Sequence, residues 1–86
     1  MAIHMFVSNY CPYCDKAKAL LEQKGLSYET FNIQQDQSAF EKMHQLTNGA
    51  RTVPQIIIHG KAIGGCDDLY ALEEQGKLDA LIQEDA

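Results

Sequence analysis

Apolar and polar positions follow two periodicities along the first third of the chain. Residues 3–7 form a short apolar, β-favouring run, which predicts a strand buried on both faces. From Pro12 the apolar positions recur at helical spacing, and Gly25 is suited to end that helix. Residues 28–33 alternate apolar and polar side chains and predict a second strand. Two strands flanking a helix form a βαβ unit, so we expect the sheet to begin parallel with a right-handed crossover.

The middle of the chain predicts a second helix and a β-hairpin. Ser38 and Glu41 have the spacing of a capping box, in which hydroxyl and carboxylate satisfy backbone donors, and Gly49 would close the helix. The β-branched run 55–59 and the short run 61–63 flank a glycine, which is typical of two antiparallel strands.

The last third predicts a closing helix over 67–75 and a short helical turn over 78–82. The expected order is therefore βαβαββα, an α/β fold with a four-stranded mixed sheet and helices on its faces. At 86 residues the chain has room for one modest core, so we expect a single domain over 1–86.

Composition narrows the classes of function. Lys and Arg total 7 against 12 Asp and Glu, and the net charge of −5 disfavours nucleic acid or an anionic membrane as a partner. The sequence offers no apolar stretch near the roughly 20 residues of a membrane helix and no pattern typical of a secretory leader. Three cysteines are an odd number, which disfavours a secreted disulfide framework. We expect a cytoplasmic protein whose cysteines are reactive and do not form a structural disulfide framework.

Cys11 and Cys14 are the strongest candidates for that chemistry. Their spacing places both sulfurs where a strand passes into a helix, close enough for a reversible disulfide. Cys11 would occupy the cap position, where backbone N–H groups and the helix dipole favour a thiolate and lower the pKa of its thiol. Cys14 would lie on the apolar face, where desolvation favours the neutral thiol. The expected roles are nucleophile for Cys11 and resolving thiol for Cys14.

A zinc site is the alternative use of these cysteines. Cys11, Cys14 and Cys66 with one histidine would supply four ligands, the candidates being His4, His44 and His59. The chain has neither a second CxxC pair nor a close histidine pair, so we expect no metal site.

Three motifs in order resemble those of glutaredoxins, and the resemblance covers essentially the whole chain. They are Cys11-Pro12-Tyr13-Cys14 opening a helix, Thr52-Val53-Pro54 before the hairpin, and Gly64-Gly65-Cys66-Asp67-Asp68 before the third helix. The resemblance implies a thioredoxin-like fold. It also implies glutathione-dependent reduction of protein disulfides and of protein–glutathione mixed disulfides.

The resemblance further implies where glutathione would bind. The family has a cis bond before the proline, so the backbone of Val53, between Thr52 and Pro54, would pair with a peptide-like substrate. Gly65 would allow close approach, while the amides of Cys66 and Asp67 and the Asp67 carboxylate would hold the γ-glutamyl end. Plain helix capping is the other interpretation of Asp67 and Asp68.

Two further side chains complete the expected glutathione site, and one departs from the family. Tyr13 would flank the bound thiol and Arg51 would meet the glycine-end carboxylate. Many glutaredoxins carry a lysine three residues before the first cysteine, where this chain has Ser8. We therefore expect weakened glutathione use. Weakened glutathione use leaves open a redoxin recycled by thioredoxin reductase. A module that binds zinc or an iron–sulfur cluster is a separate alternative.

The expected partners follow from the same resemblance. Glutathione would be a co-substrate, with no tightly bound cofactor, and glutathione reductase would act indirectly by regenerating it. Disulfide-containing or glutathionylated proteins would be the substrates, with ribonucleotide reductase as one candidate. A monomer is the default expectation.

Overall fold

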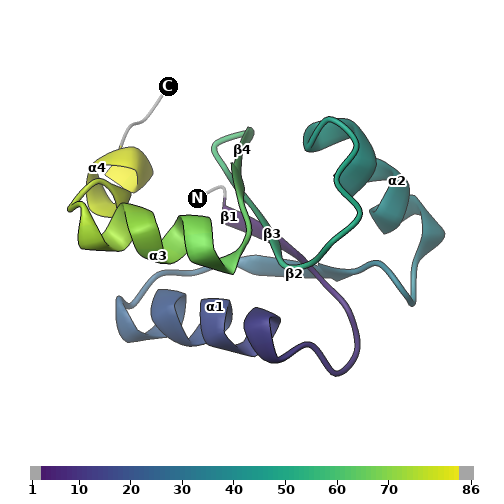
Figure 1. Ribbon diagram of the computed structural model, residues 1–86, viewed down its shortest axis with the longest axis horizontal. Helices are drawn as coiled ribbons and strands as arrows, with labels where there is room; N and C mark the ends of the chain where they lie inside the picture. Colours follow the sequence, from purple (N-terminus) through teal and green to yellow (C-terminus); the bar gives the residue numbers. More distant parts are fainter. Residues whose placement is uncertain (1–2, 84–86) are drawn as a thin grey trace.

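Four strands form one mixed sheet in the computed structural model, which describes residues 3–83 (Figure 1). The strands lie in the order β2-β1-β3-β4. β1 pairs in parallel with β2 and antiparallel with β3, and β3 pairs antiparallel with β4. Their bounds are β1 Ile3–Val7, β2 Glu29–Asn32, β3 Gln55–Ile58 and β4 Lys61–Gly64. This confirms the predicted fold class, with the expected parallel start and the expected hairpin.

Helices cover both faces of the sheet (Figure 1). α1, α3 and α4 share one hydrophobic cluster on one face, whereas α2 packs through a smaller cluster on the other. α1 and α3 lie against each other, which brings their first turns to the same region of the molecule. Their bounds are α1 Pro12–Gln23, α2 Gln37–Leu46, α3 Cys66–Glu74 and α4 Leu78–Gln83.

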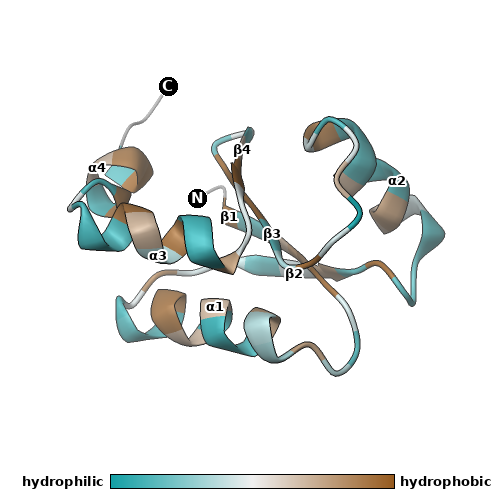
Figure 2. Ribbon diagram, viewed as in Figure 1, coloured by the Kyte–Doolittle hydropathy of each residue, from teal (hydrophilic) through white to brown (hydrophobic). Residues whose placement is uncertain are grey.

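The two central strands are apolar at every position except His4 in β1 and Gln55 in β3, because they are covered on both faces (Figure 2). Met5 in β1 and Ile56 in β3 point into the cluster beneath α1 and α3. Phe6 and Ile57, one position further along, point into the cluster beneath α2. Side chains that alternate along a strand thus fill two cores, as expected for a strand with no solvent-facing side.

The start of α2 differs from the prediction. Asp36 is the capping residue, since its carboxylate accepts hydrogen bonds from the Ser38 N–H at 3.0 Å and from the Ser38 hydroxyl at 2.7 Å. These bonds lower the pKa of the Asp36 carboxyl. The predicted capping box of Ser38 and Glu41 is therefore wrong, because the Asp36 carboxylate, two residues earlier, caps the helix.

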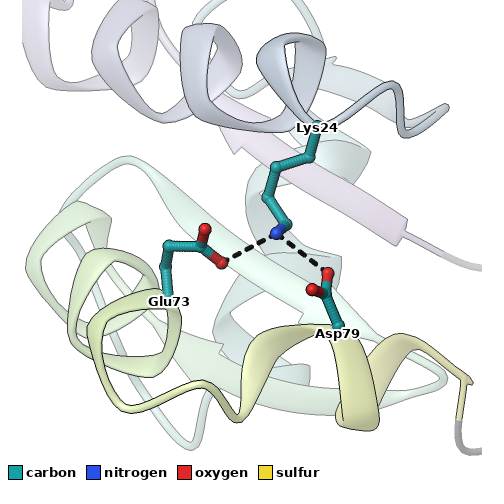
Figure 3. Close-up of polar contacts among 3 residues, drawn as sticks. All are labelled: Lys24, Glu73 and Asp79. Carbon is teal, nitrogen blue, oxygen red and sulfur yellow. Dashed lines mark ion pairs between the residues drawn. The ribbon is translucent and has the colours of Figure 1, made fainter.

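Lys24 links the end of α1 to the two C-terminal helices (Figure 3). Its Nζ lies 2.9 Å from a carboxylate oxygen of Glu73 in α3 and 2.9 Å from one of Asp79 in α4. Hydrogen bonds to Glu73 and then Asp79 raise the pKa of Lys24. Across residues 3–83 the structure contains no helix long and apolar enough to cross a membrane.

Candidate active site

Cys11 caps the first helix with its own sulfur. β1 ends at Val7, and Pro12 opens α1 at a position where its missing N–H costs no hydrogen bond. Cys11 is extended, with φ −112° and ψ 96°, and its Sγ accepts the Cys14 N–H at 3.1 Å. The sulfur therefore lies at the positive end of the helix dipole, as the sequence predicted.

The two cysteines form a disulfide and have different surroundings. Their Cα atoms are 5.1 Å apart, a separation typical of a bridged pair. Cys14 is 1% exposed within the cluster beneath α1 and α3, whereas Cys11 packs at the edge of that cluster and is half-buried. Cys11 is therefore the more accessible residue of the pair.

Amide side chains fix the loop that leads to Cys11. The Asn9 N–H donates to Oε1 of Gln34 at 2.7 Å, and Asn9 Oδ1 accepts from Nδ2 of Asn32 at 3.0 Å. These bonds connect the β1–α1 loop to the end of β2 and to the segment that follows it. This support could not be predicted from the sequence, because the partners are more than 20 residues apart and no local pattern marks them.

The segment before β3 supplies the second part of the site. The Val53–Pro54 bond is cis, as the family resemblance implied. Buried Gln55 donates to the Thr52 carbonyl at 2.9 Å and contacts the Thr52 hydroxyl at 3.3 Å, and so supports this segment. Gln55 was predicted only as a strand residue. The sequence feature that could have indicated this role is a polar side chain, Gln55, at the start of an otherwise apolar strand.

The turn before α3 supplies the third part. A Cβ built on Gly65 would lie 3.4 Å from the carbonyl oxygen of Pro54, so this turn lies directly against the cis-proline segment. The Gly65 N–H donates to the Asp68 carboxylate at 3.0 Å. Asp68 therefore has the capping role, whereas Asp67 is exposed at the first turn of the helix.

Cys66 packs as an apolar residue. Its side chain is 5% exposed in the cluster that also holds Cys14, and it forms no disulfide. Burial raises the pKa of the Cys66 thiol, and nearby Asp67 adds to this while Lys16 opposes it. The thiol is thus kept protonated and inside the core.

A family model described as glutaredoxin matches residues 3–63, which is more than half of the chain. The chain belongs to the glutaredoxin family. It is 45% identical to a probable glutaredoxin of Synechocystis sp. over 93% of this chain and 91% of the relative. It is 44% identical to glutaredoxin 3 of Escherichia coli over 94% of this chain and 96% of that protein.

Solved glutaredoxin structures have the same fold. A buckwheat glutaredoxin–glutathione complex superposes with a TM-score of 0.84 at 35% identity, covering 95% of this chain and 76% of the other. The glutaredoxin of Brucella melitensis superposes with a TM-score of 0.81 at 38% identity, covering 96% and 89%. The fold is thioredoxin-like, and as a glutaredoxin the chain is a thiol-disulfide oxidoreductase with Cys11 and Cys14 at disulfide distance.

Three residues that the family resemblance singled out, Tyr13, Arg51 and Ser8, differ in how exposed they are. Tyr13 is 60% exposed in the first turn of α1. Arg51 is exposed and lines a hollow together with residues of α2. Ser8 is half-buried in the loop before Cys11. The hollow beside Arg51 is formed with Phe40, Glu41, His44 and Gln45.

The histidines of the zinc alternative have other neighbours or lie exposed. The ring of His4 lies beside Glu29 at 3.5 Å, and Nε2 of His59 lies 2.7 Å from the Ile82 carbonyl. His44 is exposed on α2. In the described part of the chain no three His, Cys, Asp or Glu side chains are grouped to hold a metal ion.

Proposed function

We propose that this glutaredoxin reduces protein disulfides and protein–glutathione mixed disulfides with electrons from glutathione, using Cys11 as nucleophile and Cys14 as resolving thiol. One observation supports these roles above the others. The half-buried Cys11 sulfur accepts the Cys14 N–H at the start of α1, while the Cys14 sulfur is buried. This arrangement favours the anion at the first sulfur and the neutral thiol at the second.

Protein disulfides use both cysteines. The Cys11 thiolate attacks one sulfur of the substrate disulfide, forms a mixed disulfide and releases the other substrate cysteine as a thiolate, which takes up a proton. Cys14 then loses its proton and attacks the Cys11 sulfur, which releases the second substrate thiolate and leaves the Cys11–Cys14 disulfide. Two glutathione molecules reduce this disulfide in turn and leave as glutathione disulfide.

Glutathionylated proteins need Cys11 alone. Its thiolate attacks the glutathione sulfur and the protein thiolate leaves, so that glutathione becomes bonded to Cys11. A second glutathione thiolate attacks the glutathione sulfur of this mixed disulfide. Glutathione disulfide forms and the Cys11 thiolate is released. Cys14 takes no part in this route.

For the glutathione site we propose the surface between the three segments. The backbone of Val53, between Thr52 and Pro54, would pair with the cysteine residue of glutathione in strand fashion. Gly65 leaves room beside Pro54, and the N–H groups of Cys66 and Asp67 belong to the first turn of α3, where a carboxylate is favoured. The exposed Asp67 carboxylate would accept from the ammonium group, Tyr13 would form a wall, and Arg51 would attract the glycine-end carboxylate.

The same proposal sets the cellular context. Glutathione acts as co-substrate, no cofactor is tightly bound, and glutathione reductase regenerates the glutathione. We propose a monomer in the reducing cytoplasm, with disulfide-containing or glutathionylated proteins as substrates and ribonucleotide reductase as one candidate.

A coupled assay tests the proposal directly. Oxidation of NADPH is followed with glutathione, glutathione reductase and the mixed disulfide of glutathione and 2-mercaptoethanol. Wild type and Cys14→Ser are expected to turn over, and Cys11→Ser is expected to be inactive. An inactive Cys14→Ser would contradict the division of roles, and turnover with thioredoxin reductase in place of glutathione would favour the alternative reductant that Ser8 suggests.

A further inference from the structure

Tyr10 has an unusual position for a tyrosine. It directly precedes Cys11, its side chain is fully exposed at 101%, and its backbone is left-handed with φ +52°. Bulky residues rarely adopt positive φ, and such strain is concentrated at functional sites. A ring this exposed adds nothing to the core, so the fold itself gives no reason for an aromatic side chain here.

The neighbours of Tyr10 on both sides are fixed. Asn9 is held by Gln34 and Asn32 through the bonds at 2.7 and 3.0 Å, and Cys11 is held at the start of α1 by its bond to the Cys14 N–H. The backbone of Tyr10 is therefore positioned between two anchored residues. The loop therefore fixes where the side chain leaves the backbone, and the ring itself stays in solvent.

Exposed aromatic side chains are concentrated around the reactive sulfur. Within residues 3–83 the large apolar side chains that remain exposed are Tyr10, Tyr13 and Leu46, and the two tyrosines flank Cys11 in the sequence. Adjacent Cα atoms are about 3.8 Å apart, so the Tyr10 ring lies within about 10 Å of the Cys11 sulfur. A polypeptide bonded to Cys11 has its neighbouring residues within that range.

We infer that Tyr10 selects polypeptide disulfides, by packing its ring against an apolar side chain next to the substrate cysteine that becomes bonded to Cys11. The inference rests on the proposed function and names the substrate class for its two-cysteine route. A small disulfide has no flanking residues and gains nothing from this contact. A rigid aromatic ring adds affinity at low entropic cost, which is why tyrosine is frequent in binding surfaces.

Pre-reduced enzyme in single-turnover reactions, without glutathione, provides the test. Three substrates are compared: hydroxyethyl disulfide and two peptides of equal length, each closed by one disulfide. One peptide has Leu and Phe beside its cysteines, and the other has Ser and Gly. The variants are Tyr10→Asn, which removes the ring with a residue that tolerates positive φ, and Tyr10→Phe, which keeps the ring.

Wild type and Tyr10→Phe are expected to reduce the apolar peptide about three- to tenfold faster than the polar one, as one aromatic contact would give. Tyr10→Asn is expected to lose this preference while reducing hydroxyethyl disulfide at the wild-type rate. A preference that survives in Tyr10→Asn would overturn the inference, as would an equal loss on all three substrates, which would indicate altered loop geometry. Failure of wild type to reduce either peptide would instead contradict the proposed function itself.

Discussion

The sulfur of Cys11 accepts a hydrogen bond from the backbone N–H of Cys14 at 3.1 Å in the first turn of α1. The same N–H can stabilise a thiolate once the disulfide is reduced, together with the helix dipole. We expect the pKa of the reduced Cys11 thiol to lie below the value of about 8.5 for free cysteine. The ultraviolet absorbance of the thiolate, titrated in reduced wild type and in Cys11→Ser, measures it.

The difference between the two titrations isolates Cys11, because Cys14 and Cys66 remain in both proteins. Burial raises the pKa of Cys66, so its step lies on the alkaline side. As pH rises, the Cys11 step is expected first, and alkylation by iodoacetamide should follow the same curve. A difference curve with its midpoint at about 8.5 or higher would contradict the proposed role of the helix start.

The expected benefit of a low pKa is in the second half of the reaction. A lower pKa would raise the fraction of Cys11 present as thiolate at neutral pH, but the nucleophilicity of that thiolate would fall by a similar factor. Attack by Cys11 gains little. A more stable thiolate leaves faster, however, when a second thiol cleaves a mixed disulfide at Cys11.

Restoring a cation at Ser8 is expected to improve glutathione use. Ser8 lies in the loop before Cys11, where many glutaredoxins carry lysine. Ser8→Lys should lower the KM for glutathione a few-fold, since one exposed charge contact contributes on the order of 0.5 to 1 kcal/mol. The coupled assay measures KM, and Ser8→Gln is the control for a long side chain without charge.

The charge effect should weaken as salt is added, because exposed ion pairs are screened. If Ser8→Lys and Ser8→Gln have the same KM, the missing cation is not what limits glutathione binding. Reduction of hydroxyethyl disulfide by pre-reduced enzyme needs no glutathione and should be equal in both variants.

Gly64 is expected to tolerate no side chain. Its φ is +122°, and a Cβ there would overlap the Asp68 carboxylate that caps the next residue. Gly64→Ala should lower the free energy of unfolding by roughly 1–3 kcal/mol or more, from backbone strain and from loss of the cap. Urea denaturation followed by circular dichroism measures this.

Gly25→Ala is the matched control for Gly64→Ala. Gly25 is also left-handed, with φ +71°, but a Cβ there would meet nothing within 4 Å. Gly25→Ala should lower the free energy of unfolding only by the cost of placing alanine in the left-handed conformation, about 1–2 kcal/mol. Equal losses of stability in the two variants would show that the contact with Asp68 adds nothing.

Local patterns were sufficient to predict the strands and the place of the dithiol. The apolar run at β3 is buried on both faces, and Pro12 after Cys11 predicted a helix that begins at the cysteine pair. Each of these features depends on residues a few positions apart. The predicted start of α2 was wrong because Asp36 and Ser38 are both residues that favour the N-cap position, and the sequence alone does not decide between them.

Features that join distant segments could not be predicted in this way. The bonds from Asn9 to Gln34 and from Gln55 to Thr52 depend on how loops are placed by the finished sheet. The cis bond before Pro54 came only from family resemblance, since about 5% of such bonds are cis. Site support therefore had to be read from the structure, whereas the reactive pair was evident from the sequence.

Lys24 is expected to stabilise the fold without affecting catalysis, because it joins α1 to Glu73 and Asp79 at 2.9 Å each, in the helices that close the C-terminal end (Figure 3). Its pKa is raised in the folded state. The contribution of the Lys24 ion pairs to the free energy of unfolding should be complete below the pKa of Lys24 in the unfolded chain, about 10.4. It should be lost as the pH rises through the higher pKa of Lys24 in the folded protein. Lys24→Met should therefore have a lower urea midpoint than the control Lys77→Met at neutral pH, and this difference should shrink above about pH 10.4. A difference that stays constant through this alkaline range would mean that the aliphatic stem of Lys24, and not its charge, holds the helices together.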